Sequence, residues 1–324
     1  MSSYEIYKSA GLFSRNVPRY TSYPTALQFN DAVGPEQFGG WVAALPEGAR
    51  VSVYVHIPFC ERLCWFCACR TQGVRTLSPV AAYVEVLKDE ISLLAAALPK
   101  GVKIGRLHWG GGSPTILSPE MIGDLAEHLR SLVPFADDIE FSVEIDPTNL
   151  SEEKMDAFAA AGMTRSSLGV QDFNPDVQAA IGREQSFEVT RYSVEGLRAR
   201  GVKSVNIDLV YGLPFQGEAE LSYTAQKVLS LAPERVAIFG YAHVPWMAKR
   251  QRMIPEDALP DAQARFELFN LASDIFTRAG MVSIGVDHFA LPEDSMGIAA
   301  ANGVLRRNFQ GYTVDDSIAL IGLG

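Results

Sequence analysis

The chain has 324 residues, is 48% hydrophobic and carries a formal net charge of -10, with a pI near 5.1. Its length and composition suit a globular protein with one large core or two smaller ones, and the acidic charge disfavours nucleic acid and anionic membranes as partners. Residues 1–20 lack the basic-then-apolar order of a secretory signal. No stretch approaches the roughly 18 apolar residues that would span a bilayer.

Strand-like and helix-like segments alternate along the chain. Short runs rich in β-branched and apolar residues predict six strands, at residues 51–57, 104–109, 139–145, 165–169, 204–210 and 236–240. Helical apolar spacing, in several cases after Ser-Pro or Ser-Glu-Glu start signals, predicts helices at residues 79–98, 119–132, 151–161, 187–200 and 218–230. This alternation predicts an α/β fold whose parallel strands are joined by right-handed crossovers.

A polar, Pro-rich stretch at residues 253–260 precedes a long amphipathic segment at 261–279. We therefore expect three parts: an N-terminal arm at 1–48, a barrel at 49–252, and the start of another unit at 253–324.

The only four cysteines lie within ten residues, directly after the first predicted strand, in the pattern C-x3-C-x2-C-x-C. The spacing of Cys60, Cys64 and Cys67 lets one tight loop wrap three thiolates around a 4Fe-4S cube, whereas a fully ligated cube needs four. One iron is then open to chelation by an amine and a carboxylate, which S-adenosylmethionine (SAM) carries beside a reducible sulfonium. This loop, with Trp65 and Phe66 between its cysteines, resembles the signature of the radical SAM superfamily.

Two other uses of the cysteines fit the sequence less well. A structural zinc site usually sets one pair of ligands against a second pair a dozen or more residues away, and the chain supplies no second pair. Two disulfides within ten residues would be strained. A cluster needs reduced thiols, which indicates a cytoplasmic protein.

Polar residues and glycines gather where the predicted strands end, which is the working face of a parallel α/β fold. Glu144 and Asp208 sit in otherwise apolar strands, where a charge is costly unless it is paired or solvated. The glycines at 110–112 either expose backbone to a ligand or only permit a tight turn. Gln171 and Arg183 could equally be capping or surface groups, and Tyr54 could be a core residue. No histidine is assigned a catalytic role.

Several longer segments resemble the oxygen-independent coproporphyrinogen III oxidases, also called coproporphyrinogen dehydrogenases. The segments are YVHIPFCERLCWFCAC, LHWGGGSPT, VEIDPTNL, SLGVQDFN, VNIDLVYGLPFQ and FGYAHVPWM, supported by PRYTSYPTA near the start and by DHFA and RRNFQGYT later. The similarity covers nearly the whole chain. Cys69 also favours the oxidases, because the related haem-chaperone branch typically carries an aromatic residue there.

The resemblance implies a partial barrel of six β/α units with an N-terminal arm, a C-terminal domain and two bound SAM molecules. It implies that Cys60, Cys64 and Cys67 ligate the cluster and that Cys69 lies near it without being a ligand. The SAM on the open iron would contact Tyr54, Gly111 and Glu144. The second SAM would contact Phe66, Gly112, Ser113, Gln171, Arg183, Asp208 and Ala242.

The implied reaction is the anaerobic oxidative decarboxylation of two propionates of coproporphyrinogen III to vinyl groups, giving protoporphyrinogen IX. A 5'-deoxyadenosyl radical from SAM would remove the hydrogen, so no catalytic protein acid or base is expected. The implied partners are the substrate and an electron donor such as flavodoxin or ferredoxin, and the chain is expected to be a monomer. Arginines suit a substrate with four carboxylates, and the candidates are Arg15, Arg19, Arg250, Arg252, Arg306 and Arg307.

Members of this family continue past the residue that corresponds to Gly324. We therefore expect this chain to lack the rest of the second domain and one SAM contact. Three alternatives remain from the sequence: a haem-binding protein without oxidase activity, a zinc-bearing structural module, and a radical SAM enzyme with an unrelated substrate.

Overall fold

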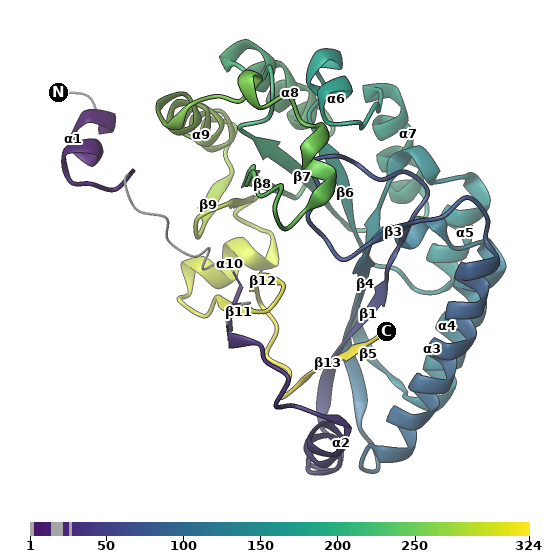
Figure 1. The fold of residues 1–324 in the computed structure, drawn as a ribbon. Helices are drawn as coiled ribbons and strands as arrows, with labels where there is room; N and C mark the ends of the chain where they lie inside the picture. Colours follow the sequence, from purple (N-terminus) through teal and green to yellow (C-terminus); the bar gives the residue numbers. More distant parts are fainter. Residues whose placement is uncertain (1–2, 14–21, 26–27) are drawn as a thin grey trace.

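The computed structural model describes residues 3–13, 22–25 and 28–324. A nine-stranded sheet in the order β13-β1-β4-β5-β6-β7-β8-β10-β9 organises the fold, with helices on its outer side (Figure 1). Six neighbouring strands run parallel to one another and confirm the six predicted strands in chain order. They are β1 (Arg50–Ile57), β4 (Lys103–Gly111), β5 (Phe135–Ile145), β6 (Arg165–Gln171), β7 (Ser204–Tyr211) and β8 (Arg235–Gly240).

The helices between these strands are also where the sequence predicts them. Ser118, Ser151 and Ser186 each accept a hydrogen bond from a backbone N–H in the first turn of the following helix, so the serine start signals act as N-caps. The five helices are α3 (Ser78–Ala97), α4 (Pro119–Leu132), α5 (Glu152–Ala160), α7 (Phe187–Ala199) and α8 (Glu218–Ser230). The fold class is therefore the predicted α/β architecture with a parallel sheet. A short helix, α6 (Pro175–Ala180), was not predicted.

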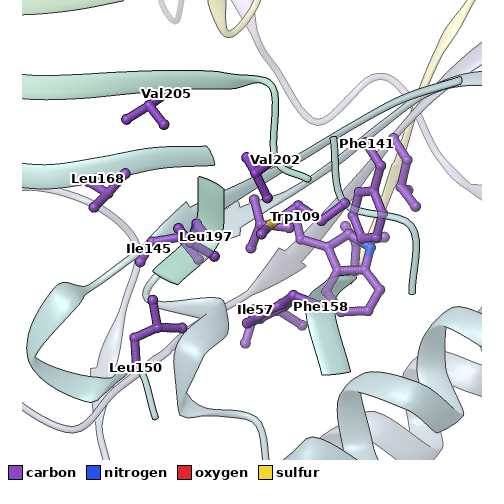
Figure 2. Packing of buried hydrophobic residues seen from close by; sticks show 14 of the residues in the cluster. Ile57, Trp109, Phe141, Ile145, Leu150, Phe158, Leu168, Leu197, Val202 and Val205 are labelled. Atoms are coloured by element: carbon purple, nitrogen blue, oxygen red, sulfur yellow. The ribbon is translucent and has the colours of Figure 1, made fainter. Parts of the chain in front are cut away.

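The two faces of the sheet differ because side chains alternate along a strand. The outward side chains are apolar and pack against the helices, with Trp109, Phe141 and Phe158 at the centre. Trp109 meets Phe141 edge-on, with ring centroids 5.2 Å apart (Figure 2). The inward side chains are polar and line a cavity of about 260 Å³; among them are Arg106, His108, Glu140, Ser142, Glu144, Ser167, Asn206 and Asp208. The outward face of the sheet is therefore buried, and the inward face carries the polar side chains that line the cavity.

Residues 253–324 add to both edges of the same sheet. Helix α9 (Ala262–Arg278) contacts α8, and β10 (His288–Ala290) pairs antiparallel with β8 and with β9 (Val282–Ile284). At the opposite edge β13 (Leu320–Leu323) pairs parallel with β1. Between them lie α10 (Ser295–Ala301) and the ribbon of β11 (Arg306–Asn308) with β12 (Gly311–Thr313). The division of the chain at residue 253 stays a prediction.

The described part of the N-terminal region contains two short helices. They are α1 (Ser3–Ser9) and α2 (Pro35–Ala43); α1 lies away from the sheet in Figure 1, and the ring of Tyr7 meets that of Phe266 on α9 edge-on. No helix in the described ranges is long and apolar enough to cross a membrane.

Candidate functional site

The cysteine loop begins where β1 ends. A two-residue strand, β2 (Phe59–Cys60), pairs with β3 (Gln72–Gly73) and so closes the loop at its base. Inside the loop the Trp65 N–H donates to the carbonyl of Ile181, which ties the loop to the segment after α6. All four cysteines are free thiols. The loop is therefore anchored at its base and at its middle.

The loop faces a cavity of about 370 Å³, which we call the cysteine cavity. It lies over the carboxyl ends of the parallel strands, as the sequence predicts. Twelve of the thirteen predicted metal- and cofactor-binding residues line it, and Tyr54 does not. The twelve are Cys60, Cys64, Cys67, Phe66, Gly111, Gly112, Ser113, Glu144, Gln171, Arg183, Asp208 and Ala242.

The three glycines at the end of β4, Gly110 to Gly112, each meet a different steric demand. A Cβ on Gly110 would lie 2.8 Å from the Glu144 carboxyl, and Gly111 has φ of +111°, which side chains rarely adopt. A Cβ on Gly112 would lie 2.4 Å from the carbonyl oxygen of Phe59. A tight turn explains only Gly111. The other two glycines let this segment approach Glu144 and the entrance of the cysteine loop.

Glu144 is the last but one residue of β5, and it lines the cysteine cavity. Its Oε2 accepts the Gly111 N–H at 3.1 Å, and its Oε1 lies 3.3 Å from Nε2 of His108. Protein atoms surround the carboxyl group of Glu144. The side chain is nevertheless 41% accessible, because it borders the cavity. Burial raises its pKa, but the contacts with His108 and Gly111 outweigh burial and leave the pKa below its usual value. Glu144 is thus an ionised acceptor at neutral pH.

Asp208 is a carboxyl of the opposite character. It accepts hydrogen bonds from Ser167 Oγ at 2.8 Å and Asn206 Nδ2 at 2.7 Å. Burial, with the nearby negative charge of Glu144, raises its pKa despite these two donors. The fold therefore favours the charged form of Glu144 and disfavours the charged form of Asp208.

Arg183 is buried beside the cysteine loop. Its Nη2 donates to the Gly169 carbonyl at 2.7 Å and lies 3.4 Å from Asp146 Oδ1, while its Nη1 lies 3.3 Å from Cys64 Sγ. Its Nε is buried and has no hydrogen-bond partner among the described residues. The guanidinium places positive charge next to a cysteine and keeps one donor unused. Near it, Gln171 ends β6 with φ of +71°.

Tyr54 lies below the cysteine cavity, on the inner face of β1. Its ring stacks on that of His108 at 5.6 Å, and its hydroxyl lies 3.0 Å from Nδ1 of His56. Burial, with the charge of Glu144, raises the pKa of this hydroxyl. Tyr54 therefore contacts His108, and His108 contacts Glu144 at the cavity.

Sequence reasoning missed Gln251, whose side chain is 1% exposed. Its Nε2 donates to the carbonyls of Phe66 at 2.8 Å and Ala242 at 3.1 Å, and its Oε1 accepts from the Val244 N–H at 2.6 Å. Arg250 beside it donates to the Cys69 carbonyl and the Thr71 hydroxyl. Both residues belong to the short helix η4 (Lys249–Met253), which clamps the cysteine loop to the end of β8. A single glutamine carries no pattern that could have indicated this.

The candidate arginines divide between several places. Arg250 lines the cysteine cavity, whereas Arg252, Arg306 and Arg307 do not. Arg307 lies over the ring of Tyr23, whose N–H donates to the Asn308 carbonyl. The PRYTSYPTA segment thus meets the β11–β12 ribbon where it is described. Arg15 and Arg19 lie outside the described residues.

Cys60, Cys64 and Cys67 fit a cluster, because all three line one cavity and their thiolates can bind different irons of one cube. The described ranges contain no group of three His, Cys, Asp or Glu side chains that could hold a metal ion. The Cys69 side chain lowers the pKa of Cys67 to about 6, and burial raises that of Cys60 to about 11. The unused Nε of Arg183 offers a further donor to a group in the cavity.

Comparison with known proteins identifies the class first. Residues 54–228 match the radical SAM superfamily, which covers the cysteine loop and the strands around it. Members of this superfamily bind a 4Fe-4S cluster and SAM.

The particular family follows from relatives that match nearly the whole of this chain. The chain is 58% identical to an oxygen-independent coproporphyrinogen III oxidase of Cereibacter sphaeroides, over 100% of this chain and 72% of the relative. It is 41% identical to the Escherichia coli oxidase of the same name, over 95% of this chain and 67% of the relative. The solved Escherichia coli coproporphyrinogen III oxidase, described as a radical SAM enzyme, superposes with a TM-score of 0.91 at 40% identity, over 97% of this chain and 71% of that chain. This chain belongs to the oxygen-independent coproporphyrinogen III oxidase family of radical SAM oxidoreductases. The relatives support this reading and not the haem-chaperone alternative.

Proposed function

We propose that this chain performs the oxidative decarboxylation of two propionate side chains of coproporphyrinogen III, giving the vinyl groups of protoporphyrinogen IX. The observation that carries the proposal is the 58% identity to a named oxidase along the entire chain, together with a cavity lined by the cysteines and the strand ends.

Cys60, Cys64 and Cys67 would hold the 4Fe-4S cluster, and Cys69 would remain a thiol beside it. When bound, the cluster and SAM supply a 5'-deoxyadenosyl radical that removes a hydrogen atom from the substrate. The buried guanidinium of Arg183 lies 3.3 Å from Cys64 Sγ and places positive charge beside the cluster ligands.

The cavity wall suits the amino acid end of SAM. The ionised carboxylate of Glu144 attracts an ammonium group, while the bare backbone at Gly111 and Gly112 allows a ligand to approach closely. Tyr54 would support this site through His108. We assign the second SAM to the other predicted residues of the wall, which are Phe66, Gly112, Ser113, Gln171, Arg183, Asp208 and Ala242.

The chain's own residues then bind, orient and exclude water, because hydrogen abstraction by a radical needs no protein acid or base. Among the described candidates Arg250, Arg252, Arg306 and Arg307, Arg250 lines the cavity and would meet a propionate carboxylate there. We further propose an electron donor of the flavodoxin or ferredoxin kind, a cytoplasmic location because the thiols must stay reduced, and a barrel that ends near residue 252.

An anaerobic assay with coproporphyrinogen III and SAM tests the proposal. Protoporphyrinogen IX and 5'-deoxyadenosine should appear together, in a ratio that stays constant during the reaction. Formation of 5'-deoxyadenosine without any change in the tetrapyrrole would point to another substrate. Haem binding without SAM cleavage would contradict the assignment as an oxidase.

A further inference from the structure

His108 lies on the inward face of β4, between two residues that the site already contains. The pairing of β1 with β4 sets it directly opposite Tyr54. The pairing of β4 with β5 sets it opposite Ser142, so Glu144, two residues further along β5, is its diagonal neighbour on the same face of the sheet. The register of the three strands therefore places His108 within reach of both Tyr54 and Glu144.

The ring of His108 is held in one orientation. It stacks on the ring of Tyr54, with centroids 5.6 Å apart and an angle of 17° between the planes. The Tyr54 hydroxyl lies 3.0 Å from Nδ1 of His56, and Nε2 of His56 lies 3.3 Å from the carbonyl of Arg70 in the cysteine loop. With its plane fixed by this stack, His108 directs Nε2 toward Oε1 of Glu144, 3.3 Å away.

Gly110 leaves the space that this contact needs. A Cβ at this position would lie 2.8 Å from the carboxyl carbon of Glu144 and 2.9 Å from Nε2 of His108. Any larger residue would therefore force one or both side chains to move. The glycine supports the same conclusion as the strand register, which is that these two side chains are packed to meet.

The direction of the hydrogen bond follows from the charge of Glu144. An ionised carboxylate only accepts, so Nε2 of His108 carries the proton and donates. Burial raises the pKa of Glu144, and the hydrogen bond from His108 is the largest of the contacts that lower it. Among the described residues, no lysine or arginine pairs with this carboxylate. A histidine N–H can stabilise the charge without the fixed positive charge of a lysine or arginine, which would neutralise it.

We propose that His108 is a positioning residue for SAM, which holds Glu144 charged and oriented so that its carboxylate receives the amino group of SAM. The proposal rests on the function proposed above. Each oxygen of Glu144 accepts one hydrogen bond from the protein, from His108 or from Gly111, and keeps a lone pair for the ligand. His108 does not line the cysteine cavity, so it acts through Glu144 and not by touching SAM.

The test measures the dissociation constant of SAM for the holoprotein with reconstituted cluster. Visible circular dichroism of the oxidised cluster is the signal, because it reports binding at the open iron. His108→Phe keeps a ring over Tyr54 but removes the donor, whereas His108→Gln keeps a donor at the position of Nε2 and removes the ring. His128→Phe is the matched control, since His128 on α4 contacts the Lys88 carbonyl and the Ser92 hydroxyl in the outer layer of helices.

His108→Phe should bind SAM about tenfold more weakly, which corresponds to ~1.4 kcal/mol, while His108→Gln and His128→Phe should stay within about threefold of wild type. In a Glu144→Gln background, His108→Phe should have no further effect, because the carboxylate through which His108 acts is gone. Equal weakening by His108→Phe and His108→Gln, or the same loss in both backgrounds, would overturn the positioning role. If His108→Phe does not hold cluster iron, His108→Asn takes its place, since its shorter amide does not reach Glu144.

The dissociation constants are measured without a tetrapyrrole, which separates this proposal from the proposed function. A wild type that binds and cleaves SAM but leaves coproporphyrinogen III unchanged would refute the proposed function alone. A wild type that does not bind SAM would refute both proposals.

Discussion

The contact between Gly112 and the entrance of the cysteine loop can be tested by one methyl group. In Gly112→Ala the Cβ would lie 2.4 Å from the Phe59 carbonyl oxygen and 2.8 Å from the Phe59 nitrogen. These are backbone atoms, and they are held in place because Gly112 N–H donates to the Ile57 carbonyl and Ser113 N–H to that of Phe59. Neither side can yield without breaking such a bond.

The expected loss of stability has two contributions, the steric overlap and the broken hydrogen bond. Overpacking costs about 1–3 kcal/mol, and each lost hydrogen bond adds about 0.5–1.5 kcal/mol. We therefore expect Gly112→Ala to lose about 2–4 kcal/mol and, at roughly 2–4 °C per kcal/mol, to lower the Tm by roughly 4–16 °C. Because Phe59 directly precedes Cys60, the variant should also hold less iron after anaerobic reconstitution.

Gly123→Ala is the matched control. Gly123 lies inside α4, and nothing lies within 4 Å of the Cβ it would gain. This substitution should stabilise the protein by about 0.5–1 kcal/mol, since alanine favours helix interiors over glycine. Thermal unfolding and iron content are measured on both variants. If Gly112→Ala matches Gly123→Ala in Tm and in iron, the close packing described for the glycine segment is refuted.

Three further outcomes are expected. Cys64→Ala should abolish cluster colour and SAM cleavage together, and retention of either would remove Cys64 from the ligand set. Gln251→Glu exchanges the two donated hydrogen bonds to Phe66 and Ala242 for repulsion, so it should cost about 2–3 kcal/mol and raise the KM for SAM; an unchanged KM would limit Gln251 to a structural role. Asp208→Asn should unfold at a higher urea concentration than wild type at pH 7 but not at pH 4. Because the fold raises the pKa of Asp208, the charged carboxyl destabilises the folded protein at a pH above that pKa. This penalty disappears as the carboxyl is protonated at lower pH. An equal gain in stability at both pH values would contradict this reasoning.

The strands and helices of the barrel were predictable because they repeat a strong pattern. Each strand has several β-branched or apolar residues, each following helix has an apolar stripe, and three of the five helices begin with a serine cap. Strands β9 and β10 have three residues each, and α6 has six. Such short elements carry too few residues for a period to stand out, and β13 is fixed mainly by its pairing with β1.

The site residues also divide into those that the sequence could predict and those that it could not. Cys60, Glu144 and Asp208 could be placed from the sequence, because they follow or end predicted strands and such ends converge in a parallel sheet. Phe66 and Arg183 came only from the resemblance, since the direction of a loop side chain depends on tertiary contacts such as that of Arg183 with Asp146. Gln251 was missed because its contact with Phe66, 185 residues away in the chain, is set by the tertiary fold.

The central claim is that three cysteines hold a cluster whose fourth iron binds SAM. Mössbauer spectroscopy of iron-57-reconstituted protein, recorded before and after SAM is added under anaerobic conditions, tests it most directly. We predict that one iron in four changes its spectrum when SAM binds, with the other three unchanged. A spectrum that does not respond to SAM, or four equivalent sulfur-ligated irons with Cys69 as the fourth ligand, would contradict the claim.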